Sequence, residues 1–441
     1  MKLYGSICIS TALRDKCGIP VQDSIRIRVG SIEVLTRLVC KEGERCTYML
    51  SPELSRALLL HKSRRLQIRY DSINDHIHLG PTIGILAVTL THRGQYDPTS
   101  VKAELIYLSH VSRSLSGQIY IFTPGSINWE NKTTRGYTFQ KGNWASATYP
   151  LPDVVYDRIT SRATEAKNLT TKQKLMQLPH LKYFNPSFFN KWQVYQMLVT
   201  DPQLKRYLPE TKDLTPENFK GMLQKYNTLF VKPSNGSLGK GIIKVTRNSG
   251  GAVSFVIYGK GKVKNYAENA EEFFKKTTRI RGDKPYIVQQ GLNLALYKGA
   301  TFDLRIIYQK NKEGNWQLGK KFVRVAPRGS SISNLSSGGR VEISKRVLKY
   351  LFHNKERIEN KNEEIKEFCL RVAKTLEEKN NAIYGELGMD IGIDKQGALW
   401  LIEVNSKPRK TTETEFSTAV MRRTFLRPLE FASYLAGFPV K

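Results

Sequence analysis

Two apolar segments near the carboxyl end of the chain, joined by a short polar turn, constrain its fold more than any other feature. They cover residues 382–393 and 398–404, and the turn between them is DKQG at 394–397. Apolar runs of this length around a turn predict two buried, paired strands. The chain has 441 residues, 40% hydrophobic and 25% charged, so it can build sizeable cores and is not mostly disordered. Its length suggests two to four domains.

Three oxygen-bearing side chains lie on this hairpin. Asp390 ends an apolar run, while Glu403 and Asn405 lie two residues apart on the second strand and face one side. Hard oxygen ligands on neighbouring strands suit Mg²⁺, which usually shares its shell with substrate phosphates. Two carboxylates buried together are costly unless a cation compensates them. The alternative is a buried ion pair between Glu403 and Lys407 or Arg409.

A glycine-rich loop, FVKPSNGSLGKG at 230–241, follows another predicted strand. The strand delivers Lys232, and Pro233 interrupts it. Glycines allow backbone N–H groups to approach a phosphate closely, and lysines neutralise its charge. The loop is not a Walker A motif, because Gly241 follows Lys240 where Ser or Thr is required. The alternative is an ordinary surface hairpin turn.

Two further segments are weaker signals taken singly. IVQQGL at 287–292 is a strand end whose backbone could bond a purine edge, although most such strands are simply buried. Asp303 and Arg305 share a strand face, and a carboxylate can hold a guanidinium where an anionic intermediate forms. Arg324, Arg328 and the loop SNLSSGGR at 333–340 follow. The alternative for Asp303 and Arg305 is a cross-strand ion pair facing solvent.

Changes in pattern along the chain predict three domains, over residues 1–75, 76–158 and 159–441. The first alternates short apolar runs with polar breaks, which indicates a small β-rich module with one helix near 52–61. The second alternates strands with a helix, which is typical of an α/β unit. We expect strands at 79–90, 117–122, 154–156 and 228–231, a hairpin over 129–149, and helices near 98–109, 191–199 and 216–226, with two more within 341–380.

The net charge and the cysteine content limit the kinds of partner and the cellular compartment that we expect. Lys and Arg number 70 against 39 Asp and Glu, a net charge of +31, which indicates a polyanionic partner such as nucleic acid, a nucleotide, an anionic wall or membrane surface, or an acidic polymer. Dispersed cations without a recognisable nucleic-acid-binding motif argue against nucleic acid. Five cysteines without CxxC spacing favour a reduced, cytoplasmic protein. The sequence shows no long apolar run for a membrane span and no secretory signal at its start.

In this order and spacing, the motifs resemble the ATP-grasp superfamily and, within it, the YheC/YheD endospore coat-associated proteins. The superfamily resemblance covers about residues 160–430, and the closer one covers nearly the whole chain, with least support before residue 75. The segments that carry it are FNPSFFNKWQVYQ (184–196), FVKPSNGSLGKGI (230–242), VQQGLNL (288–294), FDLRI (302–306), SNLSSGG (333–339), LGMDIGID (387–394) and WLIEVNSKP (400–408), with LGPTIGIL (79–86) in the same style.

The resemblance implies a mixed α+β and α/β fold. The β-rich module at 1–75 would precede an α/β pre-ATP-grasp domain at 76–158. Residues 159–441 would form an ATP-grasp domain whose two α+β subdomains clasp the nucleotide.

The resemblance also implies roles for individual residues. Phosphate contacts would come from Lys191, Lys232 and the loop residues Ser234, Gly236, Ser237, Gly239, Lys240 and Gly241. The adenine hinge would comprise Gln289, Gln290 and Leu292, with Asn334 in a second loop near the nucleotide. Catalytic contacts to the transferred phosphate would come from Arg305, Arg324 and Arg340, and metal ligands would be Asp390, Glu403 and Asn405. The usual acidic ribose contact has no counterpart at Tyr297-Lys298-Gly299, so it stays unassigned.

Such a site implies ATP and one or two Mg²⁺ ions, or Mn²⁺ in their place. The leading hypothesis is a ligase that joins a carboxylate to an amine through an acyl phosphate, with a small or polymeric acidic substrate. The alternatives are a phosphotransferase on the same fold and a structural coat protein that binds ATP without turnover. The resemblance places the protein in the mother-cell cytoplasm or on the spore coat, with coat or wall components as partners.

Overall fold

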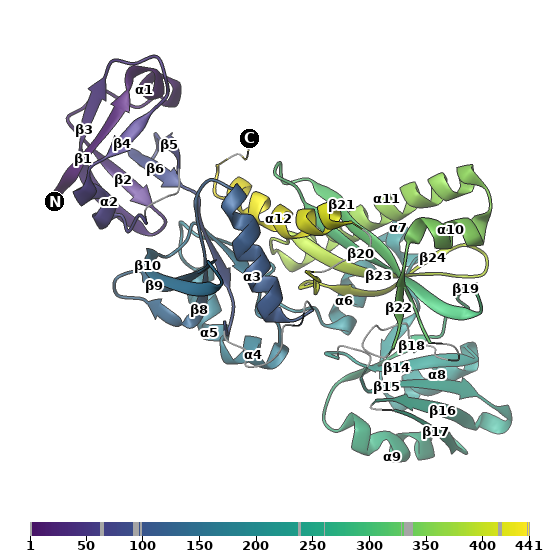
Figure 1. The fold of residues 1–441 in the computed structure, drawn as a ribbon. Coiled ribbons are helices and arrows are strands. Elements are labelled where there is room, and N and C mark those ends of the chain that lie inside the picture. Colours follow the sequence, from purple (N-terminus) through teal and green to yellow (C-terminus); the bar gives the residue numbers. More distant parts are fainter. Residues whose placement is uncertain are drawn as a thin grey trace.

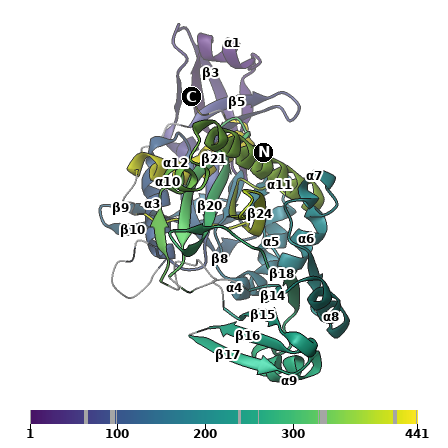
Figure 2. The same cartoon turned by 90° about the vertical axis from the view of Figure 1, so that its right-hand side faces the viewer.

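The computed structural model describes residues 2–61, 66–90, 97, 99–236, 240–259, 261–327, 329, 338–412, 417–438 and 440. The strands in this part of the chain form four sheets, one after another along the sequence (Figure 1). Figure 2 shows the first and third sheets at opposite ends of the molecule, as Figure 1 does. None of the helices described is both long and apolar enough to cross a membrane.

The first sheet has the strand order β4-β1-β3-β2-β6-β5. The helix predicted near 52–61 is present as α2 (Pro52–Ala57), which Ser51 caps and Pro52 opens. A second helix, α1 (Thr11–Cys17), is not predicted by the sequence, because Leu13 is its one buried residue and leaves no periodicity to detect. The strands are β1 (Leu3–Ser10), β2 (Ser24–Val29), β3 (Ile32–Lys41), β4 (Tyr48–Leu50), β5 (Gln67–Asp71) and β6 (His76–Gly80).

The second sheet has the order β10-β9-β8-β7-β11-β12, and its last four strands run parallel. The chain leaves β7 for β8 on one side and reaches β11 on the other, so the direction of the connections reverses at β7. The single strand predicted at 79–90 is divided, because Pro81 has no N–H to donate and separates β6 from β7. The elements are β7 (Thr82–Leu86), β8 (Gln118–Asn128), β9 (Thr133–Gln140), β10 (Asn143–Pro150), β11 (Val154–Asp157), β12 (Lys182–Phe184), α3 (Val101–Val111), α4 (Arg162–Lys167) and α5 (Leu169–Met176).

The third sheet is antiparallel, with the order β13-β18-β14-β15-β16-β17. Two helices cover one of its faces and share a core with it that includes Phe219, Phe255 and Phe273. The elements are β13 (Thr211–Asp213), β14 (Thr228–Pro233), β15 (Ile242–Arg247), β16 (Val253–Tyr258), β17 (Lys262–Ala267), β18 (Tyr286–Gln290), α8 (Pro216–Lys225) and α9 (Ala270–Arg281).

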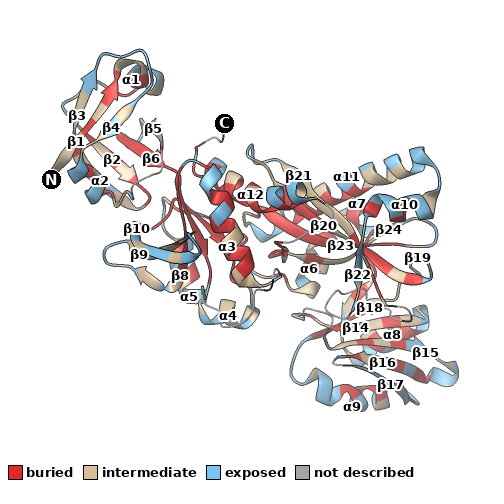
Figure 3. Ribbon diagram, viewed as in Figure 1, coloured by how far each residue is buried: buried red, intermediate tan, exposed pale blue. Residues whose placement is uncertain are grey.

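The fourth sheet has the order β22-β21-β20-β23-β24, with β19 beside β20. The predicted hairpin is present as β23 and β24, and every residue of β23 is buried, as Figure 3 shows. The helical region predicted at 341–380 is two helices, α10 and α11. The elements are β19 (Leu296–Tyr297), β20 (Ala300–Lys310), β21 (Trp316–Val325), β22 (Arg340–Glu342), β23 (Glu386–Ile393), β24 (Leu399–Asn405), α6 (Lys191–Leu198), α7 (Pro202–Lys205), α10 (Ser344–Phe352) and α11 (Lys355–Asn380).

The end of the chain returns to the second sheet. Helix α12 (Thr418–Leu435) contacts α3 and β11 as well as β20 and β21, so it lies between the second and fourth sheets (Figure 1). Its Phe425 and Leu429 are completely buried in one core with Tyr156 and Phe184 of the second sheet. Helix α12 therefore shares an apolar core with the second sheet and also contacts β20 and β21 of the fourth sheet.

A set of charged side chains, here called the junction cluster, lies beside this core. It joins residues of α3, β11, α4 and α5 to β23 and to the segment after β24. Its members are the cations Arg158, Lys172, Lys407 and Lys410 and the carboxylates Glu104, Asp157, Glu165 and Glu386. Each cation contacts at least one carboxylate, so the cluster is close to electrically neutral.

Candidate functional site

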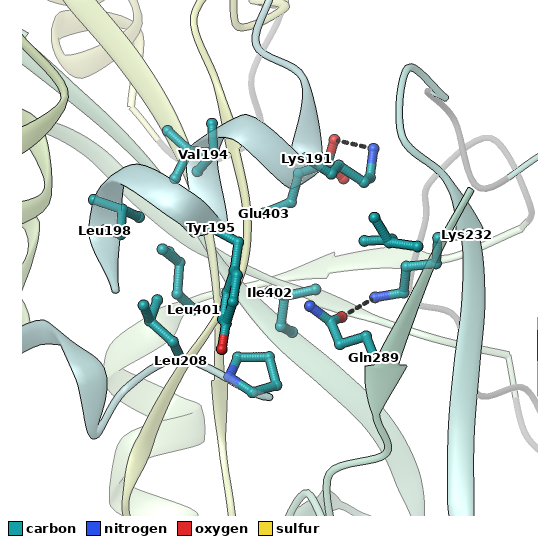
Figure 4. A pocket seen from close by; sticks show the side chains of 13 residues that line it. Lys191, Val194, Tyr195, Leu198, Leu208, Lys232, Gln289, Leu401, Ile402 and Glu403 are labelled. Atoms are coloured by element: carbon teal, nitrogen blue, oxygen red, sulfur yellow. Dashed lines mark hydrogen bonds and ion pairs between the residues drawn. The ribbon is translucent and has the colours of Figure 1, made fainter. Parts of the chain in front are cut away.

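A pocket lies between the third and fourth sheets, closed on one side by α6 (Figure 4). It brings together four residues that the sequence singles out from separate motifs, namely Lys191, Lys232, Gln289 and Glu403. The rest of its lining is largely apolar: Val194, Tyr195, Leu198, Leu208, Pro209, Ile287, Leu401, Ile402 and Val404. Such a pocket combines apolar walls with a few convergent polar groups, the usual composition of a small-molecule site.

Lys232 reaches the pocket because β14 alternates its faces: Leu229 and Val231 point into the core, and Lys232 points the other way. The residue is 9% exposed, and its ammonium donates to the amide oxygen of Gln289 at 2.6 Å. Gln289 in turn donates to the hydroxyl of Thr211 at 2.9 Å. Burial, together with the nearby Lys191 cation, lowers the pKa of Lys232 to about 8, although Glu403 opposes this shift.

Lys191 is the first residue of α6, which Asn190 caps. Its ammonium donates to the carbonyl of Gly236 at 2.8 Å and contacts a carboxylate oxygen of Glu403 at 3.1 Å (Figure 4). Its backbone N–H donates to the carbonyl of Ser234 at 2.9 Å. Lys191 therefore ties the start of the glycine-rich loop to the fourth sheet.

The described part of the glycine-rich loop is tightly constrained. A Cβ on Gly236 would lie 2.3 Å from Cγ of Pro233, and Gly241 has a φ of +76°, so both positions require glycine. Lys240 is exposed, and Ser234 is buried. The predicted phosphate contacts Ser237 and Gly239 lie outside the described residues, as does Asn334 of the second loop.

A second charged group lies on β20, β21 and β23. Strand register places Asp303 opposite Arg324, and Arg305 opposite Asp390. Nε of Arg324 donates to Asp303 at 2.9 Å, and Nη2 of Arg324 contacts Asp390 at 2.8 Å. Arg305 also forms an ion pair with Asp390. The cross-strand ion pair considered as an alternative is therefore present, but it is buried, with Asp303 only 2% exposed.

Burial strongly opposes ionisation of Asp390, but Arg305 and Arg324 outweigh it and hold the pKa of this carboxyl below its usual value. Burial lowers the pKa of Arg324, but the carboxylates of Asp390 and Asp303 outweigh this effect and raise it above its usual value. Two guanidiniums therefore face two carboxylates in this group.

The three predicted metal ligands share one face of β23 and β24. Asp390 and Glu403 are register partners, and Asn405 pairs with Gly388 two positions further along. Glu403 pairs with Lys191 and not with Lys407 or Arg409, so the predicted alternative is wrong; Lys407 contacts Asp157 at 2.8 Å instead. Within the described residues, no three His, Cys, Asp or Glu side chains gather as metal ligands, and the third candidate here is an amide. Two carboxylates and an amide oxygen on one face fit a hard cation such as Mg²⁺.

Three of the predicted residues do not join this assembly. Gln290 points away from the pocket, and its side chain accepts from the N–H of Glu210 at 3.1 Å. Arg340 is the register partner of Val325, so it lies on the face of β21 opposite Arg324 and is exposed. Leu292 is partly buried beyond the end of β18 and does not line the pocket.

The sequence motifs give no signal for Arg162, which reaches the site from α4 of the second sheet. Its guanidinium donates to the carbonyl of Phe189 and lies 3.4 Å from the amide oxygen of Asn235 in the glycine-rich loop. Asn190 donates to the same oxygen at 3.0 Å. Asn235 is thereby held from two directions, by residues that lie far apart in the sequence.

Comparison with known proteins agrees with this architecture. Residues 180–435 match the family model described as YheC/D like ATP-grasp. The endospore coat-associated protein YheD of Bacillus subtilis (strain 168) is 31% identical over 404 residues, which cover 88% of this chain and 86% of YheD. YheC of the same organism is 22% identical over 369 residues, which cover 80% of this chain and 96% of YheC.

Among solved structures, D-alanyl-alanine synthetase A from Vibrio cholerae aligns with a TM-score of 0.46 and 14% identity, covering 81% of this chain and 99% of that one. The predicted resemblance and the mixed α/β fold class are confirmed. Because the family model spans more than half of the chain, and YheD matches most of both sequences, this protein belongs to the YheC/D-like ATP-grasp family.

Proposed function

We propose that this protein is an ATP- and Mg²⁺-dependent ligase that joins a carboxylate to an amine through an acyl phosphate. The observation that carries the proposal is Lys232, a buried ammonium in a pocket that also holds Lys191. Among the described residues no carboxylate lies within ion-pair distance of Lys232, and its pKa is lowered to about 8. A buried cation without a counter-ion is stabilised when a phosphate binds beside it.

Each part of the pocket has a role in this proposal. Lys191 and Lys232 hold the α- and β-phosphates, and the glycine-rich loop closes over them. The apolar lining from α6 and β24 holds the faces of the adenine, with Gln289 at its edge. Arg305 and Arg324 face the transferred phosphate, where negative charge develops.

Asp390, Glu403 and Asn405 would hold one or two Mg²⁺ ions, which neutralise phosphate charge when bound. In the structure Arg305 and Arg324 neutralise Asp390, and Lys191 neutralises Glu403. These three cations would exchange a carboxylate for a phosphate as the nucleotide binds, so each of them would be paired at both stages.

The reaction is balanced without any further reagent. A carboxylate oxygen of the acid attacks the γ-phosphorus, and the bond to the ADP oxygen breaks. The amine then attacks the acyl carbon, phosphate leaves with the bonding pair, and the amine loses its proton to give an amide. Catalysis in this scheme is positioning plus charge neutralisation.

The test is incubation with ATP, Mg²⁺ and sets of candidate acids and amines, followed by assay of ADP and phosphate and mass spectrometry of the products. A ligase product gains the amine and no phosphate, whereas a kinase product gains a phosphate. Absence of ATP binding in calorimetry would overturn both.

A second candidate is a coat protein that binds ATP without turnover. It is favoured by the ion pairs that Asp390 and Glu403 already make with cations of the chain, and by the names of YheD and YheC as endospore coat-associated proteins. Glu403→Ala distinguishes the two. If the unchanged protein binds ATP without releasing ADP and phosphate and the variant assembles into the coat normally, the structural role is supported. If the unchanged protein releases ADP and the variant loses both this activity and coat assembly, the ligase is supported.

A further inference from the structure

The residues that precede Lys191 connect the second sheet to helix α6. This connection, here called the strap, covers residues 185–190, between the end of β12 and the start of α6. It belongs to the FNPSFFNKWQVYQ segment that the sequence singles out, of which the pocket accounts only for the part from Lys191 onwards. The strap is neither helix nor strand, so its conformation depends on contacts from other parts of the chain.

The first half of the strap is fixed to the fourth sheet. The side-chain oxygen of Asn185 accepts from the N–H of Gly385 at 2.9 Å, and its amide donates to the carbonyl of Glu386 at 2.7 Å. The hydroxyl of Ser406 donates to the carbonyl of Ser187 at 2.5 Å. The start of the strap is therefore held by β23 and by the segment that follows β24.

The second half of the strap is held by one turn of α4, a helix that lies between β11 and β12 of the second sheet along the chain. Glu165 accepts from the N–H of Phe188 at 3.1 Å. Arg162 lies three residues earlier and hence on the same side of the helix. Its guanidinium donates to the carbonyl of Phe189 and lies 5.2 Å from the centre of the Phe188 ring. Two side chains of α4 thus fix successive residues of the strap.

Arg162 also contacts the glycine-rich loop. Its Nη1 lies 3.4 Å from the amide oxygen of Asn235. Lys191 binds the same loop on either side of this residue, because its N–H donates to the carbonyl of Ser234 at 2.9 Å and its ammonium to that of Gly236 at 2.8 Å. A guanidinium carries several N–H donors in one plane and can bind two oxygens at once. Arg162 therefore bridges the strap and the loop that Lys191 grips.

The charge of Arg162 is not matched by a neighbouring carboxylate. Among the described residues none lies within ion-pair distance of it, and its partners are neutral oxygens. Burial lowers its pKa, and Glu165 and Glu403 oppose this shift at longer range. Arg158, four residues earlier, instead forms ion pairs with two buried carboxylates. The contacts of Arg162 thus orient two segments of the chain and do not complete an ion pair.

We propose that Arg162 is a positioning residue for the nucleotide. It ties the strap to the glycine-rich loop, so that the ammonium of Lys191 and the start of the loop keep one relative position when the phosphates bind. Because α4 belongs to the second sheet, this arginine makes ATP affinity depend on a part of the chain outside the pocket. The inference deepens the proposed function and rests on it for the identity of the ligand.

The first test is calorimetry of the full-length protein with ATP and Mg²⁺. Arg162→Ala should lower ATP affinity about tenfold, and Arg162→Lys should recover only part of it, because an ammonium does not bridge two oxygens as the guanidinium does. The matched control is Lys167→Ala, which removes an exposed cation at the other end of α4 and should change affinity by less than about twofold. A fall in thermal stability with unchanged ATP affinity would overturn the inference.

A double-mutant cycle tests whether Arg162 acts through the loop. If it does, Arg162→Ala combined with Asn235→Ala should bind ATP no more than about twofold more weakly than Arg162→Ala alone. Losses that multiply would show that the two residues act independently, and would overturn the proposed route.

Hydrogen exchange of the protein without nucleotide separates this inference from the proposed function. Arg162→Ala should speed exchange at the N–H groups of Lys191 and Gly236 about fivefold, and leave that of β20 unchanged. Unchanged exchange at both N–H groups would overturn the inference. If the variant exchanges faster but the unchanged protein binds no ATP, the tie between strap and loop stands and the ligase proposal fails.

Discussion

The junction cluster and the pocket between the third and fourth sheets both contain lysines and carboxylates, but their lysines differ in how their charge is paired. In the junction cluster, Lys410 contacts Glu386 at 2.9 Å, and Lys407 contacts both Asp157 and Glu165. In the pocket, Lys232 is buried as well, but its contact is the neutral amide of Gln289. The cations of the junction cluster are paired with carboxylates of the chain, whereas no carboxylate among the described residues lies within ion-pair distance of Lys232.

Buried cations of this protein can therefore be divided, without reference to any motif, into those paired with a carboxylate of the chain and those without such a partner. A buried ion pair that loses one partner leaves an uncompensated charge and destabilises the fold strongly. A buried cation that already lacks a counter-ion raises the free energy of the folded state, and its removal relieves that cost. The two regions should therefore respond to substitution with opposite signs in stability.

The largest effect is expected in the junction cluster, at Glu386. This completely buried carboxylate contacts Lys410 at 2.9 Å, Arg158 at 3.1 Å and the amide of Gln309 at 3.0 Å. Glu386→Gln leaves Arg158 and Lys410 with one carboxylate fewer and should destabilise the protein by about 3–5 kcal/mol. Urea denaturation followed by circular dichroism measures it, and an unchanged midpoint would contradict the comparison.

The next effect is expected in the pocket, at Lys232. Lys232→Met keeps the volume of the side chain and removes its charge, so ATP affinity should fall by about 100-fold. Thermal stability without ATP should stay the same or rise, because an uncompensated buried charge is removed. Calorimetry and thermal denaturation test the two statements, and a variant that loses both affinity and stability would show that Lys232 is a structural cation.

A smaller effect is expected from pH. Burial lowers the pKa of Lys232 to about 8 from its ordinary value of 10.5, so the folded state loses this proton before the unfolded state does. The contribution of Lys232 to stability without ligand should therefore rise between about pH 8 and pH 10.5. ATP favours the ammonium form, so its affinity should fall as pH rises through 8, by about tenfold between pH 7 and pH 9.

Calorimetry in buffers of different ionisation enthalpy should show proton uptake on ATP binding near pH 8.5. The Lys232→Met variant provides the control, since it should lose this uptake together with most of the pH dependence. Uptake that persists in the variant would assign the proton to another group.

The smallest effect is expected at an exposed ion pair, which sets the baseline for the others. Glu363 and Lys366 lie 2.6 Å apart on α11, and their side chains are 64% and 49% exposed. Glu363→Gln should change stability by less than about 0.5 kcal/mol in the same urea experiment. A loss as large as that of Glu386→Gln would mean that burial does not distinguish the two kinds of pair.

Much of the pocket could be predicted because its residues lie in local patterns. Lys232 follows a short apolar strand and precedes glycines, and Glu403 lies in an apolar strand with Asn405 two residues later. Strand alternation is a local property, so the facing of these side chains follows from the sequence. The orientation of Gln290 and Arg340 could not be obtained in this way, because it depends on where β18 ends and on how β22 pairs with β21.

The junction cluster and Arg162 could not be predicted for a related reason. Arg158 and Glu386 are 228 residues apart, and Arg162 and Asn235 are 73 apart. A charged residue in a strand or at a helix start is usually exposed, so nothing in the sequence distinguishes these residues from the many surface cations of a chain with a net charge of +31.

The sequence by itself determined the two-strand hairpin, the glycine-rich loop, the three oxygen-bearing side chains on one face and the family. Only the tertiary structure decided which charges are completed within the chain. It connected the second and fourth sheets through α12 and the junction cluster, and among the described residues it placed no carboxylate within ion-pair distance of Lys232. The physical reason is the separation in sequence of the residues involved. Residues adjacent in sequence decide which face of a strand a side chain occupies and where a turn forms. The energy of a buried charge depends instead on partners that are distant in sequence and that only folding brings near.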